Sequence, residues 1–423
     1  MLSRAPRVIF AGMKAERIGR GHGLLAGGAR FERKTGLFAR FFAPGFHKVL
    51  DRLDRGLETG SITGYLPDGT TRVLGGRNPG FEAIVHLHDW RALLRLATNG
   101  SIGWYQAWEA GEWDSPDAVP LFALFMANGV SLGETGRARG PWRLAAKAAH
   151  WLNRNTHSGA KRNIQAHYDL GNDFYAQWLD PSMTYSSACF EEGDDLEVAQ
   201  HRKWEMLAGR IGSPDTVLEI GCGWGGLSGY LAERGAQVTG ISLSDEQLAW
   251  ARDHHPEVEF RHQDYRDTSG SYDAIVSVEM VEALGLEYWP TFMDCIARNL
   301  NSGGRAAIQY ISMRDELFEA YARSADFIQA YIFPGGLLIR TSEFRRLAEE
   351  RGLEWQDQLD FGADYAETLQ CWRARFDQVA AEGHLPAGFD ERFQRLWRYY
   401  LMYCEGGFRG GGINVHQVTL IKH

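Results

Sequence analysis

The stretch VLEIGCGWGGLSGYLAERG, from Val217 to Gly235, combines a glycine-rich turn with one carboxylate. It contains the pattern G-x-G-x-x-G at Gly221, Gly223 and Gly226, and Glu219 stands two residues before the first of these glycines. Such a turn lets the backbone approach a ligand closely, and the N-terminus of the helix that follows offers unpaired N–H groups. Two ligand classes fit this pattern: a nicotinamide-type dinucleotide and S-adenosylmethionine.

The position of the carboxylate favours S-adenosylmethionine. A dinucleotide fingerprint has its acid at the end of the second strand, where it binds the ribose hydroxyls. Here the second predicted strand ends in Gly240-Ile241-Ser242 with no acid at its tip, and Glu219 lies at the end of the first strand. A carboxylate at that place can face a cationic group. Methyl-donor binding is therefore the preferred interpretation, and dinucleotide binding is the alternative.

Strands and helices alternate from about Pro214 onward. The predicted strands are TVLEIG, QVTGIS, VEFRHQDY, YDAIVSVE and GGRAAIQYIS, and helical patterns lie between most of them. Strands connected by helices of this length form a parallel, doubly wound sheet whose ligand site lies at the carboxyl ends of the strands. The predicted fold class is therefore α/β, with a Rossmann-like domain.

Composition limits the classes of function. A chain of 423 residues with 44% hydrophobic residues is long enough for two domains. The formal net charge of −9 argues against a nucleic-acid partner. The five cysteines are scattered without a C-x-x-C pair, so the sequence predicts no disulfide framework and no metal site, and it fits a reducing cytoplasm. No segment approaches the roughly 18 apolar residues of a membrane span.

The N-terminal part has a different character. Residues 1–135 are interpreted as a small α+β domain, with a hairpin around Asp68-Gly69 and a helix that stops at Gly100. Residues 136–162 contain seven Lys or Arg residues and no acid. This segment is interpreted either as a basic amphipathic helix on an anionic membrane surface or as a solvated linker helix, and both readings stay open.

Several ordered motifs resemble one known family. QAHYDLGNDFYAQWLDPSMTYSSACF, VLEIGCGWGGL, GISLSDEQ, YIFPGG and FGADYAETLQCWRARF are similar to the cyclopropane-fatty-acyl-phospholipid synthases, which are related to mycolic acid and 10-methyl fatty acid methyltransferases. GSIGWYQAWEAGEWDSPD resembles the lipid-associated domain of the full-length synthases. The resemblance implies a class I methyltransferase domain over 163–423, with an acyl-chain-binding insertion around 310–410.

The resemblance also assigns the donor site. It places Tyr168, Tyr185 and Ser186 at the methionine end of S-adenosylmethionine. Gly221 and Gly223 would line the backbone side of the donor, Ser242 and Gln247 its ribose, and Asp264 and Tyr265 its adenine. Glu219 is the carboxylate that can face a cationic group.

The implied reaction is methyl transfer to a cis double bond, after which a base must remove a proton. An alkene is a poor nucleophile, so the reaction needs an apolar slot, dry walls and π faces near the developing cation. Most of the C-terminal aromatic residues are nevertheless expected to be ordinary core. These are Tyr310, Phe318, Tyr321, Phe327, Tyr331, Phe333, Phe361 and Tyr365.

In the synthases the base is bicarbonate, and the resemblance implies a matching cradle here. The corresponding residues are Glu282, Gln309, Ile311, Tyr365 and the backbone at Ser187. Gln309 replaces a histidine and Ser187 replaces a cysteine, so the cradle loses a titratable ring. Glu279 is more readily interpreted as a structural cap at a strand-to-helix turn, and the same reading is open for Glu282.

These departures leave the product open between a cyclopropane and a methyl-branched alkene. The leading hypothesis is a cytoplasmic enzyme, peripheral at the inner face of the membrane, that methylates unsaturated acyl chains of phospholipids. The alternatives are an acyl-carrier-linked or small-molecule acceptor, and a donor-binding lipid carrier without turnover. A homodimer stays open.

Overall fold

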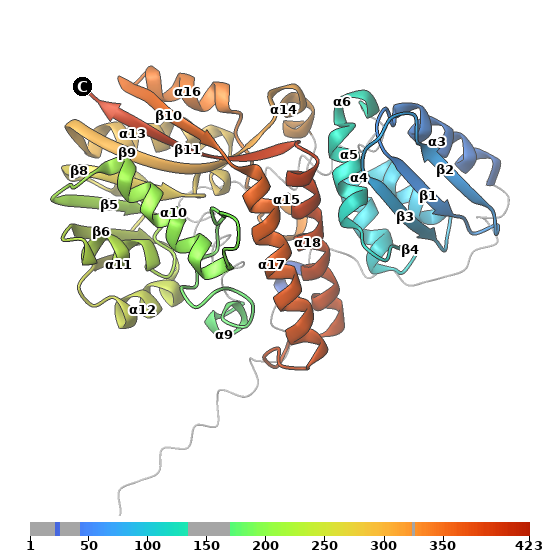
Figure 1. The fold of residues 1–423 in the computed structure, drawn as a ribbon, viewed down its shortest axis with the longest axis horizontal. Coiled ribbons are helices and arrows are strands. Elements are labelled where there is room, and N and C mark those ends of the chain that lie inside the picture. Colours follow the sequence, from blue (N-terminus) through green and yellow to red (C-terminus); the bar gives the residue numbers. More distant parts are fainter. Residues whose placement is uncertain (1–21, 26–42, 134–169, 324–325) are drawn as a thin grey trace, which may run out of the picture.

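A seven-stranded sheet forms the centre of the C-terminal part of the molecule (Figure 1). The computed structural model describes residues 22–25, 43–133, 170–323 and 326–423. The strand order is β10-β11-β9-β8-β5-β6-β7. β11 pairs antiparallel with both β10 and β9, and every other pair in this sheet is parallel. The strands are β5 (Thr216–Ile220), β6 (Gln237–Ser242), β7 (Glu259–His262), β8 (Tyr272–Val278), β9 (Leu300–Met313), β10 (Leu353–Asp360) and β11 (Ile413–Lys422).

Helices cover both faces of this sheet. Successive residues of a strand point to opposite faces of the sheet. In β5, Val217 packs against the helices on one face, and Leu218 packs against the helices on the other face. The first layer is α10 (Leu196–Ile211), α11 (Gly226–Glu233) and α12 (Asp245–His254), and the second is α13 (Trp289–Asn299) and α16 (Thr341–Glu349). The predicted α/β doubly wound fold is confirmed.

Further helices gather beside the carboxyl ends of the parallel strands (Figure 1). They are α9 (Asn172–Tyr175), α14 (Asp315–Ala322), α15 (Phe327–Tyr331), α17 (Gly362–Ala381) and α18 (Glu391–Arg409). The insertion expected around 310–410 is therefore not one continuous block, because α16 and β10 within it belong to the sheet and its helical cover. The extra helices come in two pieces, α14 with α15 and α17 with α18.

Residues 43–132 form an α+β unit with its own sheet, which we call the N-terminal unit. Its sheet has the order β2-β1-β3-β4, and the predicted hairpin joins β1 to β2. The elements are α3 (Ala43–Gly56), β1 (Ser61–Tyr65), β2 (Thr71–Gly75), β3 (Glu82–Leu87), α4 (Arg91–Glu109), β4 (Trp113–Asp114), α5 (Val119–Ala127) and α6 (Gly129–Leu132). A short helix, α1 (His22–Leu25), precedes it.

The helix expected to stop at Gly100 instead bends there and continues. Gly100 has φ 59° and ψ −139°, values outside the helical region, and α4 resumes on its far side as far as Glu109. Glycine adopts positive φ without the steric cost that a Cβ imposes. The chain therefore turns inside one helix at this residue, and the expected end of the helix is a kink.

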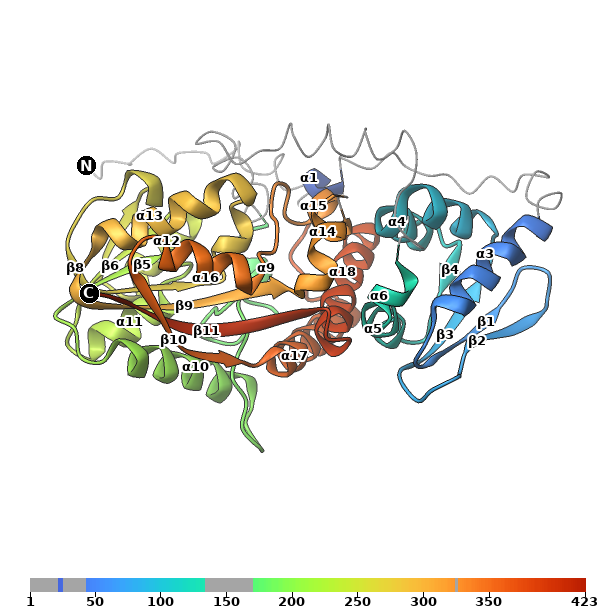
Figure 2. The same cartoon turned by 90° about the horizontal axis from the view of Figure 1, so that it is seen from above.

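The N-terminal unit packs directly on the C-terminal helices. Figure 1 and Figure 2 both place α5 beside α18, and one buried cluster continues from Phe122 of α5 to Tyr399 of α18. Gly406 of α18 permits this approach, because a Cβ there would lie 2.9 Å from the backbone nitrogen of Ala123. The two parts therefore share a core.

Two sequence predictions fall outside the described residues. The basic segment 136–162 and Tyr168 both lie in 134–169, which the structure does not describe. Within the described ranges, none of the helices is long and apolar enough to span a bilayer. The same ranges contain no cluster of His, Cys, Asp and Glu that could hold a metal ion.

Candidate active site

A cavity of about 560 Å³ lies where the carboxyl ends of the strands, the extra helices and the N-terminal unit meet. We call it the central cavity. Its lining runs from the glycine turn after β5, past the ends of β6 and β8, to the helices α15, α17 and α18, and on to α4 and α5. One continuous space therefore joins the predicted donor site to a largely apolar region.

The glycine turn forms one end of the central cavity. Gly221 and Gly223 have φ of 84° and 54°, and a Cβ at Gly223 would meet no atom within 4 Å. Glu219 is buried, accepts a hydrogen bond from the Ser228 hydroxyl, and has its pKa raised to about 7 by burial. The open space at the turn and the carboxylate behind it fit the donor that the sequence predicts.

The ends of β6 and β7 supply the next expected contacts. Ser242 and the buried Gln247 both line the cavity, and the Ser242 hydroxyl lies 3.4 Å from Oε1 of Gln247. Tyr265 also lines it, and its buried hydroxyl has no hydrogen-bond partner among the described residues. Asp264 differs from expectation in one respect: its carboxylate accepts two hydrogen bonds from the Arg266 guanidinium, at 2.9 and 2.6 Å. The carboxylate therefore already has a cationic partner.

The loop that carries Tyr185 and Ser186 lies against a buried lysine. Lys203 of α10 is fully buried, and its Nζ donates to the Ser186 hydroxyl at 2.6 Å. The Tyr185 hydroxyl lies 2.8 Å from that of Tyr400 on α18. Burial lowers the pKa of Lys203 to about 8 even though Glu279 and Glu219 favour its charged form. A cation thus stands directly behind the predicted methionine end of the donor.

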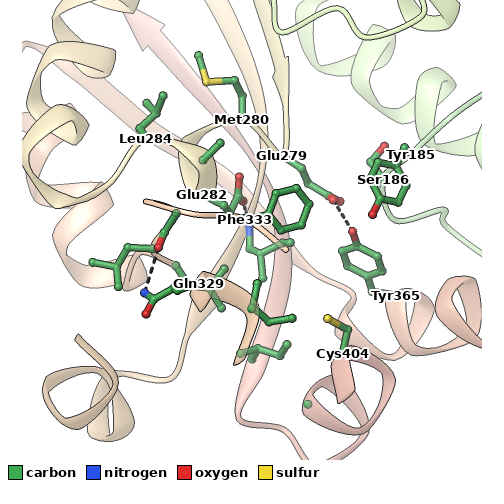
Figure 3. A pocket seen from close by; sticks show the side chains of 18 of the residues that line it. Tyr185, Ser186, Glu279, Met280, Glu282, Leu284, Gln329, Phe333, Tyr365 and Cys404 are labelled. Atoms are coloured by element: carbon green, nitrogen blue, oxygen red, sulfur yellow. Dashed lines mark hydrogen bonds between the residues drawn. The ribbon is translucent and has the colours of Figure 1, made fainter. Parts of the chain in front are cut away.

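Glu279 is the centre of a polar cluster beside this loop, and Figure 3 shows its hydrogen bond to Tyr365. Its Oε1 accepts hydrogen bonds from the Ser187 backbone N–H at 2.8 Å and from Gln309 Nε2 at 2.9 Å, and its Oε2 accepts one from the Tyr365 hydroxyl at 2.7 Å. Three of the groups expected to hold a bicarbonate therefore hold a side-chain carboxylate of the chain itself. The interpretation of Glu279 as a structural cap is not what the geometry shows.

The backbone at Glu279 is strained. The residue has φ 50°, and only two other non-glycine residues in the described ranges have positive φ. Such a conformation costs about 1–3 kcal/mol and persists where the surroundings enforce it, often at functional sites. Burial raises the pKa of Glu279, and the hydrogen bonds from Tyr365 and Ser187, followed by the charge of Lys203, act in the opposite direction.

Glu282 lies apart from that cluster. Its Oε1 accepts the backbone N–H of Ile311, and its Oε2 has no hydrogen-bond partner among the described residues. Burial, and then the nearby negative charge of Glu279, raise the pKa of Glu282 to about 8. The expected single cradle is therefore divided: Gln309, Tyr365 and Ser187 surround Glu279, and Ile311 alone contacts Glu282. Two carboxyl groups with different environments line one wall.

Aromatic rings form much of the remaining wall. Of the eight aromatic residues singled out in the sequence, Tyr321, Phe333 and Tyr365 line the central cavity, and the other five do not, which agrees with the expectation that most are core. Tyr400 and Phe408 of α18 add further rings. An aromatic face attracts a cation, and more strongly where water is excluded.

Sequence reasoning missed Lys203 and misjudged Glu279. A signal for Lys203 exists, because it falls between Ala199 and Leu207 at spacings of four on the buried face of α10, where a lysine is unexpected. No comparable signal marks Glu279. Its partners stand 92, 30 and 86 residues away in sequence, so only the fold brings them together.

The sequence of this chain is similar to those of known proteins. Residues 155–418 match the family model described as mycolic acid cyclopropane synthetase. The chain is 38% identical over 384 residues to the tuberculostearic acid methyltransferase of Mycobacterium tuberculosis, covering 84% of this chain and 86% of that relative. It is 33% identical over 333 residues to the cyclopropane-fatty-acyl-phospholipid synthase of Escherichia coli K12, covering 78% and 85%.

A solved structure is similar as well. The crystal structure of a mycolic acid cyclopropane synthase complexed with SAH and CTAB has a TM-score of 0.58 at 30% identity, and the match covers 62% of this chain and 98% of that chain.

Proposed function

Because the chain belongs to the mycolic acid cyclopropane synthetase family, we propose that it methylates the cis double bond of an unsaturated acyl chain in a membrane phospholipid. It is an S-adenosylmethionine-dependent C-methyltransferase. One observation supports this acceptor most directly: a single cavity joins the glycine turn, the Glu279 carboxylate and an apolar, aromatic region. A hydrocarbon chain fits such a space, whereas a polar acceptor would leave its polar groups unpaired.

The residues at the glycine turn suit the donor. Gly223 leaves room for its backbone side, and Gly221 belongs to the same turn. Gln247 and Ser242 offer polar atoms for the ribose, and Tyr265 offers a hydroxyl without a hydrogen-bond partner among the described residues. When bound, S-adenosylmethionine supplies an electrophilic methyl group. Lys203 and Ser186 then stand where a carboxylate of the methionine end can be neutralised.

The walls of the cavity provide what the addition step demands. When the π electrons of the alkene form the new carbon–carbon bond, a positive charge develops on the neighbouring chain carbon. Phe333, Tyr365 and Tyr400 present rings to this space, so they can stabilise that charge without capturing it. The largely apolar lining also excludes water, which would otherwise add to the cation.

We infer that Glu279 removes the proton that ends the reaction. Its carboxylate accepts hydrogen bonds from Ser187, Gln309 and Tyr365, which are three of the groups that the resemblance assigns to a bicarbonate. In this proposal Glu279 takes the part of that base, and no separate anion is needed. The raised pKa makes it a better proton acceptor than an exposed carboxylate, and its three hydrogen bonds fix its direction. Glu282, whose pKa is raised to about 8, is mostly neutral at pH 7. It therefore adds little negative charge beside Glu279.

Loss of a proton from a chain carbon gives a methyl-branched alkene, which is the product we propose. The 38% identity to the tuberculostearic acid methyltransferase supports it. Ring closure to a cyclopropane, by proton loss from the new methyl, is the second candidate, and the 33% identity to the Escherichia coli synthase favours that outcome. Both products have the same mass, so mass alone does not separate them.

The choice of a membrane phospholipid as acceptor depends on the N-terminal half. The basic segment 136–162 suits anionic headgroups, and an enzyme held at the inner face of the membrane by such charges needs no membrane span. We therefore propose a cytoplasmic enzyme that is peripheral at the inner face of the membrane. An acyl-carrier-linked chain is the competing acceptor, and it would need no affinity for vesicles.

Product identification tests the proposal. Purified protein is incubated with methyl-labelled S-adenosylmethionine and vesicles of a cis-monoenoic phospholipid, the acyl chains are released, and proton NMR identifies the product. Vinyl signals beside a methyl branch support the methyl-branched alkene, and upfield ring-proton signals establish the cyclopropane. Labelling of an acyl-carrier-linked chain but not of the vesicles would overturn the phospholipid assignment.

A further inference from the structure

The N-terminal unit contributes a wall to the central cavity. Its lining side chains come from α4, α5 and α6, and they carry no charge. Besides the two polar residues Asn99 and Ser101 and three glycines, the N-terminal lining is apolar, and it consists of Leu96, Trp104, Phe122, Phe125, Met126 and Leu132. A unit that only attached the enzyme to a membrane would not need to face the reaction cavity.

The kink in α4 brings this wall into place. Gly100 and Ser101, at the bend, both line the cavity, and the Ser101 hydroxyl accepts the backbone N–H of Phe327, the first residue of α15, at 3.2 Å. On the far side of the kink, Gln106 donates to the Tyr331 hydroxyl at 3.3 Å. The helix therefore contacts α15 at both ends of that short helix.

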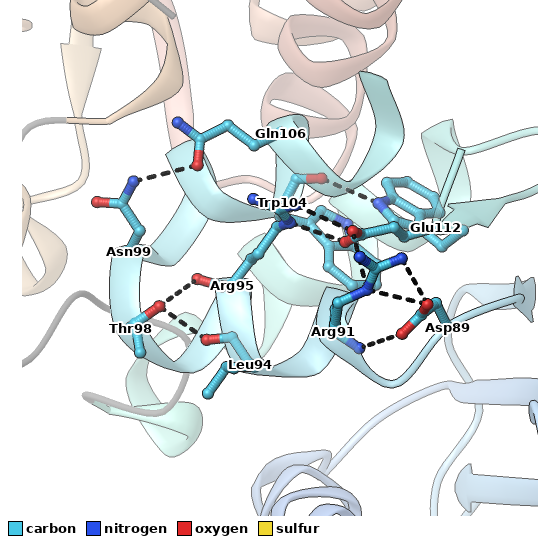
Figure 4. A network of polar contacts seen from close by, with 10 residues as sticks. Asp89, Arg91, Leu94, Arg95, Thr98, Asn99, Trp104, Gln106 and Glu112 are labelled. Atoms are coloured by element: carbon cyan, nitrogen blue, oxygen red, sulfur yellow. Dashed lines mark hydrogen bonds and ion pairs between the residues drawn. The ribbon is translucent and has the colours of Figure 1, made fainter. Parts of the chain in front are cut away.

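A buried ion pair holds the N-terminal end of α4 in place (Figure 4). Glu112 is 1% exposed, and Arg95 donates two hydrogen bonds to it, at 2.8 and 3.0 Å, while Arg91 bonds to Asp89 at 2.9 Å. Bidentate arginine–carboxylate pairs restrict geometry as well as adding attraction. Together with the close contact of α5 on Gly406, they make this wall a fixed surface.

We propose that the N-terminal unit forms the subsite for the methyl-terminal part of the acyl chain, beyond the reacting double bond. This inference rests on the proposed function. The other end of an esterified chain carries a polar ester and headgroup, which the uncharged and mostly apolar wall from the N-terminal unit would leave without partners. The methyl-terminal end has no polar atom, so it matches a wall made of Leu96, Trp104 and Phe122.

The subsite then sets how many carbons fit beyond the double bond. Each methylene transferred from water into an apolar pocket contributes about 0.8 kcal/mol, which is close to fourfold in binding constant. Affinity is expected to rise by about that factor per methylene until the chain meets the wall, and then to stop rising. Met126 is well placed to set this limit, because it lines the cavity and lies against Gly410 and Gly412 of the C-terminal part.

The test varies chain length on one side of the double bond at a time. Binding of cis-monoenoic fatty acids to the protein saturated with SAH is measured by calorimetry for wild type, Met126→Ala and Met126→Trp. Val130→Ala is the control, because Val130 is 59% exposed on the neighbouring helix and does not line the cavity. SAH affinity and the melting temperature show which variants fold.

Met126→Ala is expected to accept one or two more methylenes on the methyl side, Met126→Trp fewer, and Val130→Ala the same number as wild type. A shift on the carboxyl side, or no shift in folded Met126 variants, would overturn the proposal. If Met126→Ala does not fold, Phe125→Ala provides the enlarged pocket. Because the readout is binding, it is independent of turnover: absence of product from every lipid defeats the proposed function and leaves the length dependence measurable.

Discussion

Replacing Glu279 by glutamine distinguishes the role of its carboxylate as a proton acceptor from its role as a hydrogen-bond acceptor in the polar cluster. Glutamine keeps the size of the side chain and can still accept from Tyr365, but it cannot take a proton. General-base catalysis contributes about 10²–10⁴-fold, which corresponds to about 2.7–5.4 kcal/mol of activation free energy at 1.36 kcal/mol per tenfold. Turnover of Glu279→Gln is therefore expected to fall by about that factor.

Glu282→Gln is the matched comparison, because the two carboxyl groups line the same wall. With a pKa raised to about 8, Glu282 is mostly protonated at pH 7, and glutamine resembles a protonated carboxyl in shape. Its turnover is expected to fall by less than about tenfold, or less than 1.36 kcal/mol. The order of the two effects is thus the reverse of what the family resemblance implies.

The assay measures transfer of labelled methyl groups to phospholipid vesicles, with SAH affinity measured by calorimetry. Both variants are expected to bind SAH within a few-fold of wild type, because neither residue lies at the glycine turn. Three results would refute the reasoning: normal turnover in Glu279→Gln, a larger loss in Glu282→Gln, or a loss of SAH affinity that parallels the loss of turnover.

Three further predictions concern other parts of the molecule. Lys203→Met removes a charge that favours ionised Glu279, so the pKa of Glu279 rises further; the acid limb of the pH–turnover profile should move to higher pH, and an unchanged limb would contradict this. Gly406→Ala should lower the melting temperature, since overpacking costs about 1–3 kcal/mol, whereas Gly209→Ala on an open helix face should not. Neutralising four cations of the basic segment (Arg137, Arg139, Arg143 and Lys147) should weaken binding to anionic vesicles by about 1 kcal/mol per charge, most clearly at low salt. Vesicle sedimentation measures this binding, and unchanged binding would contradict the prediction.

The sequence predicts the sheet well because its information is local. The strands β5, β6 and β8 are short segments that contain Val, Ile or Leu, and the glycines after β5 indicate the turn that follows. The antiparallel β11 was not predicted, since the last strand pairs with a segment about a hundred residues earlier. The sequence predicts a helix end at Gly100 where the structure has a kink, because a glycine that bends a helix and a glycine that ends one look alike in sequence.

The candidate site was predicted in composition but not in arrangement. Gln309, Tyr365 and Ser187 do meet at one carboxylate, yet that carboxylate belongs to Glu279 and not to Glu282. Only two residues of chain separate the two glutamates, and the positive φ of Glu279 turns its side chain toward the cluster. Sequence patterns do not reveal such a local turn. The apolar wall from the N-terminal unit depends on the contact between α5 and α18, whose residues lie almost 300 positions apart in the chain. Sequence patterns do not reveal this contact either.

Chemical rescue is the most direct test of a base carried by the chain. Glu279→Gly removes the carboxylate and relieves the positive φ, and it leaves the N–H of Ser187, Gln309 and the Tyr365 hydroxyl facing an empty place. We expect this variant to be nearly inactive in bicarbonate-free buffer and to recover turnover when bicarbonate or formate is added, while Glu279→Gln, whose site stays filled, does not recover. No rescue in a Glu279→Gly protein that still binds SAH, or stimulation of the wild type by bicarbonate, would contradict the role assigned to Glu279.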